Sequence, residues 1–242
     1  MLTGVAIAAA ALAALSAIKG KGTSSMSSGK ANFYGVKPYT YYDWAPIVSV
    51  LAPGFSLNPT FVMKWFEVES GFNPAAIGSP KAMYQGYPRE IGLAQLYNPD
   101  DFDNLGISRE KLRAYCMPPN TQILTRRLTD EEMNYAVKTA MMLIANCKVR
   151  AIKALQGAGC RWDEQSTYQM TKLVHALPGL VKGVSAVRAK LGRAPVDFEE
   201  FSANIYHVTL DAGTERYRSM WPRLLENAYK TGRVIPKRTV LS

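Results

Sequence analysis

A glutamate stands where an apolar, helix-like run meets a sharp stop. In the stretch FEVESGFNP, residues 66–74, Glu69 is followed closely by Gly71 and Pro74, which end helices. A buried carboxylate costs several kcal/mol unless it is paired or protonated. We expect Glu69 to lie half in the core and half in a cleft, where desolvation raises its pKa toward neutrality and suits it to general-acid chemistry. The alternative is a side chain that points into water or accepts hydrogen bonds from a loop.

The residues before Glu69 predict the helix that carries it. Asn58 is a candidate N-cap, and Pro59 fits the first helical position. Apolar side chains at positions 61, 62, 65, 66 and 68 form a wide stripe at helical spacing. The pattern therefore predicts a helix that ends at about Ser70.

A second, longer helix is predicted in the middle of the chain. Thr129 and Glu132 form a capping box, and the following residues continue helical periodicity for about seven turns. Gly157 and Gly159 are expected to end it. This segment is the candidate central core helix, with one face formed by Met133, Val137, Ala140, Met141, Ile144, Cys147, Ala151 and Leu155.

The remaining pattern is also mainly helical. Residues 166–177 predict a helix closed by Pro178 and Gly179, and residues 179–192 begin another. A helix over 215–229 is predicted to be kinked or split by Pro222. A short hairpin is predicted near residues 83–98. Because no run of alternating strands, internal repeat or glycine-rich phosphate loop occurs, the predicted fold class is mainly α.

The first eighteen residues contain no charged side chain, and a helix over 1–18 would extend about 27 Å, enough to cross a hydrocarbon core. We expect a hydrophobic anchor helix. A removed signal peptide and an alanine-rich helix packed on protein are the alternatives. Residues 19–45 are a Gly/Ser-rich tether with an aromatic lead-in, and a folded body begins at 46.

Charge and composition limit the class of partner. The chain has 29 Lys and Arg against 19 Asp and Glu, a net charge of +10 and a pI of about 9.5. A polyanion is therefore expected nearby: nucleic acid, an anionic membrane surface or an anionic cell-wall polymer. The basic residues are scattered and are not interleaved with aromatic side chains, so no direct nucleic-acid binding is expected.

Cysteine and histidine usage indicates neither a metal site nor a cofactor. The three cysteines, Cys116, Cys147 and Cys160, show no ligand spacing, and the chain has only two histidines, His175 and His207. One disulfide with one free thiol and three buried thiols both remain open.

Three sequence motifs together resemble one family of enzymes. ESGFNP at 69–74, followed by GLAQL at 92–96, resembles the lytic transglycosylases of the soluble-lytic type, which have a lysozyme-like fold. LVHALPGLV at 173–181 is similar to a degraded form of the family's A-Y-N-A-G-P-G stretch. The resemblance covers residues 46–190 as a catalytic domain and leaves 191–242 as a C-terminal helical extension.

The resemblance implies a set of site residues. Glu69 matches the family's catalytic glutamate, and the segment with Leu93 and Gln95 matches the one that lines the sugar cleft. Gln95 is then an amide donor to a sugar oxygen, and Ser70 bonds the carboxylate or the substrate. Gln95 comes 26 positions after Glu69, a longer gap than is usual in the family, with PKAMYQGYPRE as the inserted material.

The third motif departs most from the family. Val174 replaces the tyrosine that lies close to the catalytic acid, so Tyr168, Tyr84 or Tyr97 is a candidate replacement. His175 replaces the family's asparagine and is a candidate substrate contact, with a packed or surface histidine as the alternative.

The reaction implied by the resemblance needs one carboxylate. Glu69 protonates the glycosidic oxygen between N-acetylmuramic acid and N-acetylglucosamine and then accepts the proton of the muramic 6-hydroxyl, which closes a 1,6-anhydro ring. A hydrolytic muramidase would need a partner carboxylate. Asp100, Asp101 and Asp103 are available, but NPDDFDN is interpreted as a polar turn with Asx caps.

The expected setting is extracytoplasmic and membrane-associated, in a cell envelope or a bacteriophage virion. The expected partners are peptidoglycan glycan strands, the membrane through residues 1–18, and virion or envelope proteins. A muramidase or wall endopeptidase on the same fold is one alternative function. A non-catalytic, membrane-anchored structural protein is another.

Overall fold

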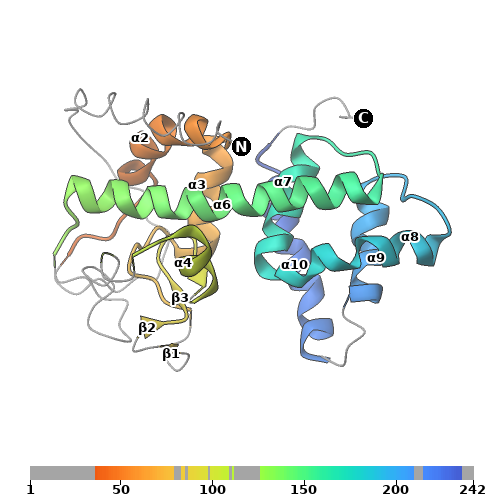
Figure 1. Cartoon of the computed structure of the whole chain (residues 1–242). Helices are drawn as coiled ribbons and strands as arrows, with labels where there is room; N and C mark the ends of the chain where they lie inside the picture. Colours follow the sequence, from red (N-terminus) through yellow and green to blue (C-terminus); the bar gives the residue numbers. More distant parts are fainter. Residues whose placement is uncertain are drawn as a thin grey trace. The chain divides into compact units, whose positions relative to one another are not determined.

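The computed structural model describes residues 36–78, 83–84, 87–97, 99–108, 111, 126–209 and 215–235 (Figure 1). Helices account for 68% of the described residues, which confirms the mainly α class. The anchor helix predicted over 1–18 lies outside the described residues, as do Cys116 and most of the tether.

The chain divides into two compact units at Leu143, inside its longest helix, and each is described by itself. This division falls within the catalytic domain predicted over 46–190, whose boundaries stay a prediction.

The described part of the first unit begins with a helix that the sequence analysis did not predict, α2 (Tyr41–Leu51), followed by the 3-10 helix η2 (Ala52–Phe55). Its N-terminus is a capping box, in which the Thr40 backbone N–H and hydroxyl both donate to the Asp43 carboxylate, at 2.7 and 3.0 Å. Trp44, Val48 and Leu51 point into the core at helical spacing. The lead-in to the body is therefore already packed before residue 46.

The helix that carries Glu69 forms as predicted, as α3 (Pro59–Ser70). The Asn58 side chain accepts the Thr60 N–H at 2.9 Å, and Pro59 occupies the first turn, where no backbone donor is needed. Gly71 ends the helix at φ +58°, a left-handed conformation that glycine adopts without steric cost.

The predicted hairpin region contains two short antiparallel pairs. In the second pair Glu90 lies opposite Tyr97, and Ile91 lies opposite Leu96. The next segment was interpreted from the sequence as a polar turn, and this interpretation is wrong. The segment forms the short helix α4, whose three aspartates lie in the first turn, where the helix dipole favours negative charge. The elements are β1 (Met83–Tyr84), β2 (Tyr87–Pro88), β3 (Glu90–Ile91), β4 (Leu96–Tyr97) and α4 (Asp100–Leu105).

A polar cluster joins the start of the first unit to the chain just before the long helix. The Leu128 N–H donates to the Tyr39 hydroxyl at 2.6 Å, and burial raises the pKa of that hydroxyl. Arg127 lies 4.1 Å from the centre of the Tyr39 ring and pairs with Asp43 at 2.6 Å. These contacts connect segments that are about ninety residues apart in sequence.

The predicted core helix is α6 (Asp130–Ala158), and the unit boundary lies within it. Its capping box is confirmed: the Glu132 N–H donates to the Thr129 hydroxyl at 3.2 Å, and the Thr129 N–H donates to the Glu132 carboxylate at 2.8 Å. The predicted apolar face is buried except for Met133, which is half-buried. Gly157 lies inside the helix, and Gly159, at φ +70°, ends it.

The second unit is helical in its described part. It contains α7 (Glu164–Ala176), the 3-10 helix η3 (Pro178–Gly183), α8 (Val184–Leu191), α9 (Phe198–Thr209) and α10 (Glu215–Gly232). Pro222 lies inside α10 without splitting it. The predicted helix over 166–177 and the C-terminal helix are confirmed, whereas α9 was not predicted.

Helix α7, not only α6, is central to the second unit. Nine of its thirteen residues are buried, although many are polar, and it packs along α10. The threonines satisfy their hydroxyls within the helix, since Thr171 donates to the Thr167 carbonyl at 2.7 Å. At the contact with α10 a Cβ on Gly232 would overlap the Gln169 side chain, so this position needs glycine.

Cys147 and Cys160 are both buried, which is the arrangement expected of thiols used as small apolar side chains. Burial raises the pKa of the Cys160 thiol to about 11.

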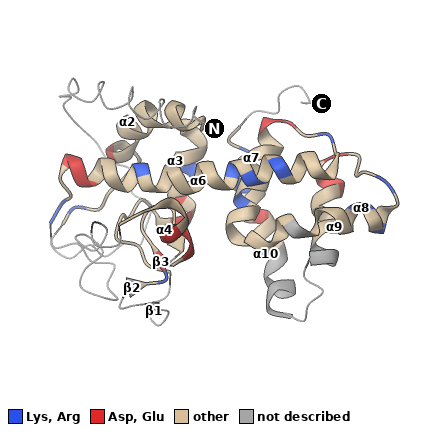
Figure 2. Cartoon of the chain, viewed as in Figure 1, with Lys and Arg blue, Asp and Glu red and all other residues tan. Residues whose placement is uncertain are grey.

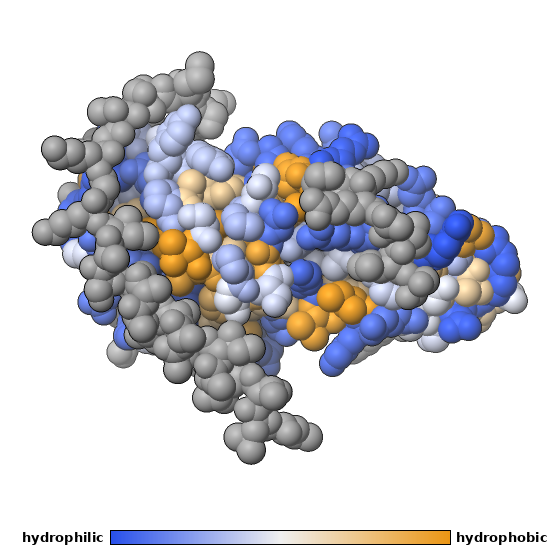
Figure 3. Space-filling model, turned by 90° about the horizontal axis from the view of Figure 1, so that it is seen from above, coloured by the Kyte–Doolittle hydropathy of each residue, from blue (hydrophilic) through white to orange (hydrophobic). Residues whose placement is uncertain are grey.

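On the face seen in Figure 3, orange apolar patches are separated by hydrophilic surface.

Within the described ranges, no single helix is both long and apolar enough to span a membrane. Residues Tyr41–Phe55 and Pro59–Ser70 meet the length and composition criteria only as a pair, and that pair is bent by 119°.

Candidate active site

Glu69 lies on the last turn of α3 and is half-buried, as the sequence predicted for its position. The helix beneath it is fixed by fully buried aromatic side chains, including Phe61, Trp65 and Phe66. Ser70, the neighbouring candidate, donates its hydroxyl hydrogen to the Phe66 carbonyl at 2.9 Å. The Ser70 hydroxyl therefore caps its own helix, and only its lone pairs are left to accept a hydrogen bond.

The turn after Glu69 holds two consecutive residues in the left-handed region. Gly71 has φ +58° and Phe72 has φ +66°, a conformation that costs a residue with a Cβ on the order of 1–3 kcal/mol. The surroundings hold Phe72 there: its carbonyl accepts the Trp44 indole N–H at 3.0 Å, and its ring meets Tyr41 edge-on at 6.3 Å. The turn that follows the catalytic candidate is thus fixed by α2.

Asn73 turns the chain back toward the hairpins. Its backbone N–H donates to the Ser70 carbonyl at 3.0 Å, and its side chain accepts the Ala75 N–H at 2.9 Å. The side chain is 1% exposed, so the asparagine of ESGFNP acts within the protein. An Asx turn of this kind explains why the motif needs a short amide side chain at this position.

The two motifs that suggested the family meet in space. The Ala76 carbonyl, just after ESGFNP, accepts the Gly92 N–H at 2.8 Å and the Gln95 side-chain amide at 3.2 Å. Ile77 forms an antiparallel bridge with Ile91, and a Cβ on Gly78 would overlap the Glu90 carboxylate. The segment from Glu69 onward is therefore clamped against the loop that contains Gln95.

Gln95 is placed differently from its predicted role. It is 8% exposed, and its amide donates to two backbone carbonyls, those of Ala76 and Gly92, at 3.2 and 2.9 Å. Both amide hydrogens are thus used within the protein, which argues against Gln95 as an amide donor to a sugar oxygen; that role stays a prediction. Gln95 instead positions the loop, and it does so at φ +55°.

Leu93, the other residue of this loop, is 2% exposed. A side chain so deeply buried packs in the core, which argues against a direct contact with substrate; the predicted role of Leu93 in substrate binding stays a prediction.

Two candidate tyrosines lie in the same unit as Glu69 and share one arginine. Tyr97 is 37% exposed, and its hydroxyl accepts a hydrogen bond from Arg89 at 2.9 Å. The Arg89 guanidinium lies 5.8 Å from the Tyr84 ring centre and 5.9 Å from that of Tyr97, within cation–π range. The arginine rigidifies both rings on the hairpins.

Tyr168 and His175 lie in the second unit, on α7. Tyr168 is 1% exposed, and Lys148 donates to its hydroxyl at 3.2 Å and lies 4.7 Å from its ring centre. Burial lowers the pKa of Lys148. Tyr168 is thus a packed side chain within its unit, whereas His175 is half-buried in the last turn of the helix.

Sequence reasoning missed Tyr41 and Arg89 as neighbours of the two motifs. Tyr41 is 47% exposed and touches Phe72 directly. The signal for it was available, because Thr40 and Asp43 form a T-x-x-D capping box that places Tyr41 on the first helical turn. Arg89 offered no comparable signal, since its ring contacts depend on the hairpin register.

Metal binding has no support from the geometry: within the ranges that the structure describes, no group of three or more His, Cys, Asp or Glu side chains could hold an ion.

No protein-family model matches the chain, and no curated protein matches it significantly. The likeness to lytic transglycosylases therefore depends on the motifs and on how their segments meet.

Proposed function

We propose that the protein is a peptidoglycan lytic transglycosylase in which Glu69 is the catalytic acid and base. The observation that carries the proposal is the clamp between the two motifs: the Ala76 carbonyl binds both Gly92 and Gln95. It explains physically why ESGFNP and GLAQL occur together in one chain.

The half-buried position of Glu69 supports the role of acid. A general acid must reach the substrate and still be positioned by the protein, and a half-buried side chain on the last turn of a packed helix meets both conditions. Glu69 donates its proton to the glycosidic oxygen as the bond to N-acetylmuramic acid breaks. The resulting carboxylate then accepts the proton of the 6-hydroxyl of that same sugar.

The single-carboxylate mechanism is favoured because the nucleophile is part of the substrate. Ring closure by the 6-hydroxyl is intramolecular, so no water has to be held and activated by a second carboxylate. Asp101, one of the alternative partners, already accepts the Tyr97 N–H at 2.7 Å within the protein. This commitment disfavours Asp101 as the base of a hydrolytic muramidase.

The proposed setting is the cell envelope or a bacteriophage virion, outside the cytoplasm, with glycan strands as substrate. In that setting the net charge of +10 would draw the protein to anionic wall polymers.

The decisive experiment is mass spectrometry of fragments released from purified peptidoglycan by the full chain. We expect 1,6-anhydromuramyl ends, and we expect Glu69→Gln to lower their release by about 10²- to 10⁴-fold, the usual contribution of a general acid–base group. Glu67→Gln is the matched control, because Glu67 lies on the same helix, is exposed and pairs with Lys64 at 2.7 Å.

Each other product would assign a different function. New reducing ends would indicate a muramidase, and free amines would indicate an endopeptidase. Unchanged release by Glu69→Gln would remove Glu69 from the mechanism, and no release by the wild type would favour a non-catalytic structural protein.

A further inference from the structure

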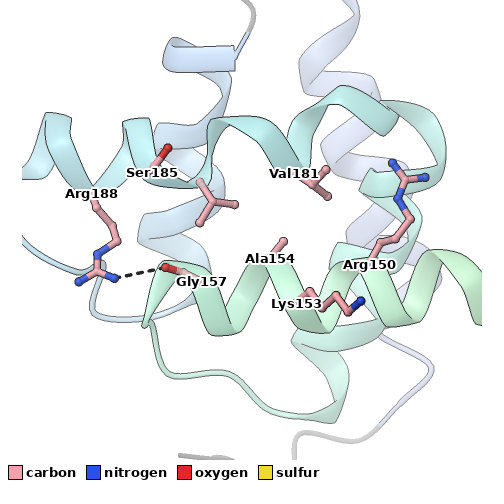
Figure 4. A pocket seen from close by; sticks show the side chains of 8 residues that line it. Arg150, Lys153, Ala154, Gly157, Val181, Ser185 and Arg188 are labelled. Atoms are coloured by element: carbon pink, nitrogen blue, oxygen red, sulfur yellow. Dashed lines mark hydrogen bonds between the residues drawn. The ribbon is translucent and has the colours of Figure 1, made fainter. Parts of the chain in front are cut away.

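A basic groove of about 610 Å³ lies within the second unit, between the C-terminal half of α6 and the segment η3–α8 (Figure 4). Its volume falls within the range of about 300–1,000 Å³ that is usual for small-ligand sites. Arg150 and Lys153 come from α6, and Arg188 comes from α8. None of the described residues that line it carries a carboxylate, so the groove has the character of an anion-binding site and not of an acid catalyst.

The two arginines are fixed at the ends of the groove. Arg150 donates to the Pro178 carbonyl at 2.8 Å, and Arg188 donates to the Gly157 carbonyl at 3.3 Å, the dashed line in Figure 4. A guanidinium has five N–H donors, so each arginine keeps donors for a ligand after making these bonds. The hydrogen bonds reduce the rotamer freedom that binding would otherwise have to restrict.

The three cations of the groove are not neutralised by any residue that the structure describes. None of them forms an ion pair with another residue in the described part of the chain. Elsewhere three exposed arginines do pair with carboxylates: Arg126 with Glu132, Arg127 with Asp43, and Arg193 with Glu200. Figure 2 shows the same concentration of blue on the C-terminal half of α6 and on α8. The groove therefore carries an uncompensated positive field that favours an anion.

The floor of the groove is apolar, which favours anions that also carry an apolar group. Ala154, Val181 and Val184 lie between the basic side chains, and Ser185 adds one exposed hydroxyl. Arginine and lysine are the usual residues for phosphate recognition. The described lining residues include no aromatic side chain, so they offer no stacking surface of the kind that single-stranded nucleic acids use. A phosphate attached to a hydrocarbon-bearing group fits both parts of the groove: the phosphate fits the basic side chains, and the hydrocarbon fits the apolar floor.

We propose that this groove binds the phosphate headgroup of an anionic phospholipid, with Arg150, Lys153 and Arg188 around the phosphate and the valines against the glycerol and acyl part. The inference does not depend on the proposed enzymatic activity, because the groove contains none of the residues proposed for catalysis. It would give the second unit a membrane contact that is separate from residues 1–18.

The test is co-sedimentation of the full chain with vesicles of phosphatidylcholine alone or of phosphatidylcholine with phosphatidylglycerol, at physiological salt. We expect binding only to the anionic vesicles. Replacing all three groove cations by glutamine should weaken it about a hundredfold, since each Lys or Arg near an anionic surface contributes about fivefold. The matched control replaces Lys138, Lys230 and Arg233, which are exposed, lie outside the groove and remove the same charge.

Equal losses in the two triple variants would overturn the proposal, because binding would then depend on net charge alone. Absence of binding to anionic vesicles would overturn it too, even if soluble glycerol 3-phosphate bound. Circular dichroism checks that the variants fold. Lys153→Glu is the second variant, because Lys153 is exposed and makes no hydrogen bond or ion pair with another described residue. It should weaken vesicle binding more than Lys138→Glu, and Glu69→Gln should leave that binding unchanged.

Discussion

The two units differ in how their backbones make turns. Among the residues of the first unit that the structure describes, three other than glycine adopt left-handed conformations, namely Ser56, Phe72 and Gln95. In the described part of the second unit, positive φ occurs only at Gly159 and Gly192, where it has no steric cost. The first unit therefore stores backbone strain that the described part of the second unit does not show.

The location of this strain is informative. Phe72 belongs to ESGFNP and Gln95 to GLAQL, so two of the three strained residues lie in the two segments that clamp each other next to Glu69. Strained backbone persists only where surrounding contacts hold it, and it concentrates at functional sites. The observed strain thus supports a functional role for the first unit independently of the motif resemblance.

In the second unit the energetically unfavourable feature is a buried charged group and not a strained backbone. Lys172 is 4% exposed, and burial lowers the pKa of its ammonium to about 7. Lys172 and the basic groove distinguish the second unit by its positive charge, whereas the first unit is distinguished by its turns and its aromatic packing. The following predictions would break or sharpen that contrast.

The largest effect is expected from Leu93→Ala in the clamped loop of the first unit. Removing a buried leucine should lower the free energy of unfolding by about 2–5 kcal/mol, through lost burial and a cavity. Hydrogen exchange followed by mass spectrometry should report lost protection in residues before Leu143 and retained protection in α7.

The matched control is Leu173→Ala, since Leu173 is 1% exposed on α7. Its loss of protection should be confined to the second unit. If either variant lowers hydrogen-exchange protection equally in both units, the two units unfold together, and the contrast between them does not extend to their stability.

The next largest effect is expected from Lys172→Met. Removing the buried ammonium should raise the free energy of unfolding by about 1–4 kcal/mol at pH 6, as replacement of buried charges by apolar groups can do. Urea unfolding followed by circular dichroism at pH 6 and pH 9 measures the difference.

The pH dependence fixes the sign. The folded-state pKa of Lys172, about 7, lies below the ordinary value of 10.5, so between these values only the unfolded state binds the proton. The wild type should therefore become more stable as pH rises from 7 toward 10.5, and the advantage of methionine should shrink. Lys190→Met, at an exposed position on α8, should lack this dependence; a dependence shared by both variants would rule out Lys172 as its source.

The smallest effect is expected from Thr129→Ala at the start of α6. Loss of the N-cap hydroxyl should lower the free energy of unfolding by about 1 kcal/mol. Thr129→Ser, which keeps the hydroxyl, should lie within a few tenths of the wild type. A thermal melt measures both, and equal losses would show that the methyl group matters and the cap does not.

Helix ends were the most predictable part of the fold. Asn58 and Gly71 bound α3, and the capping box of Thr129 and Glu132 begins α6, because these interactions join residues only a few positions apart. The same locality would have found α2 from Thr40 and Asp43. Helix α9 lies in a segment to which no cap or period was assigned.

The candidate site was predictable only in part. The half-buried position of Glu69 follows from its place at the end of an apolar helix. The role of Gln95 did not follow, because its two acceptors include the Ala76 carbonyl, which is 19 positions away. A side chain's chemical type is local information, whereas the partners that occupy its donors are not.

Periodicity by itself determined that the chain forms capped helices, and it placed Arg150 and Lys153 on one face of α6, since they are three residues apart. Only the tertiary structure brought Arg188 to the same groove, and only it buried a helix as polar as α7. Burial and charge proximity are set by segments that are distant in the chain, and no local pattern specifies them.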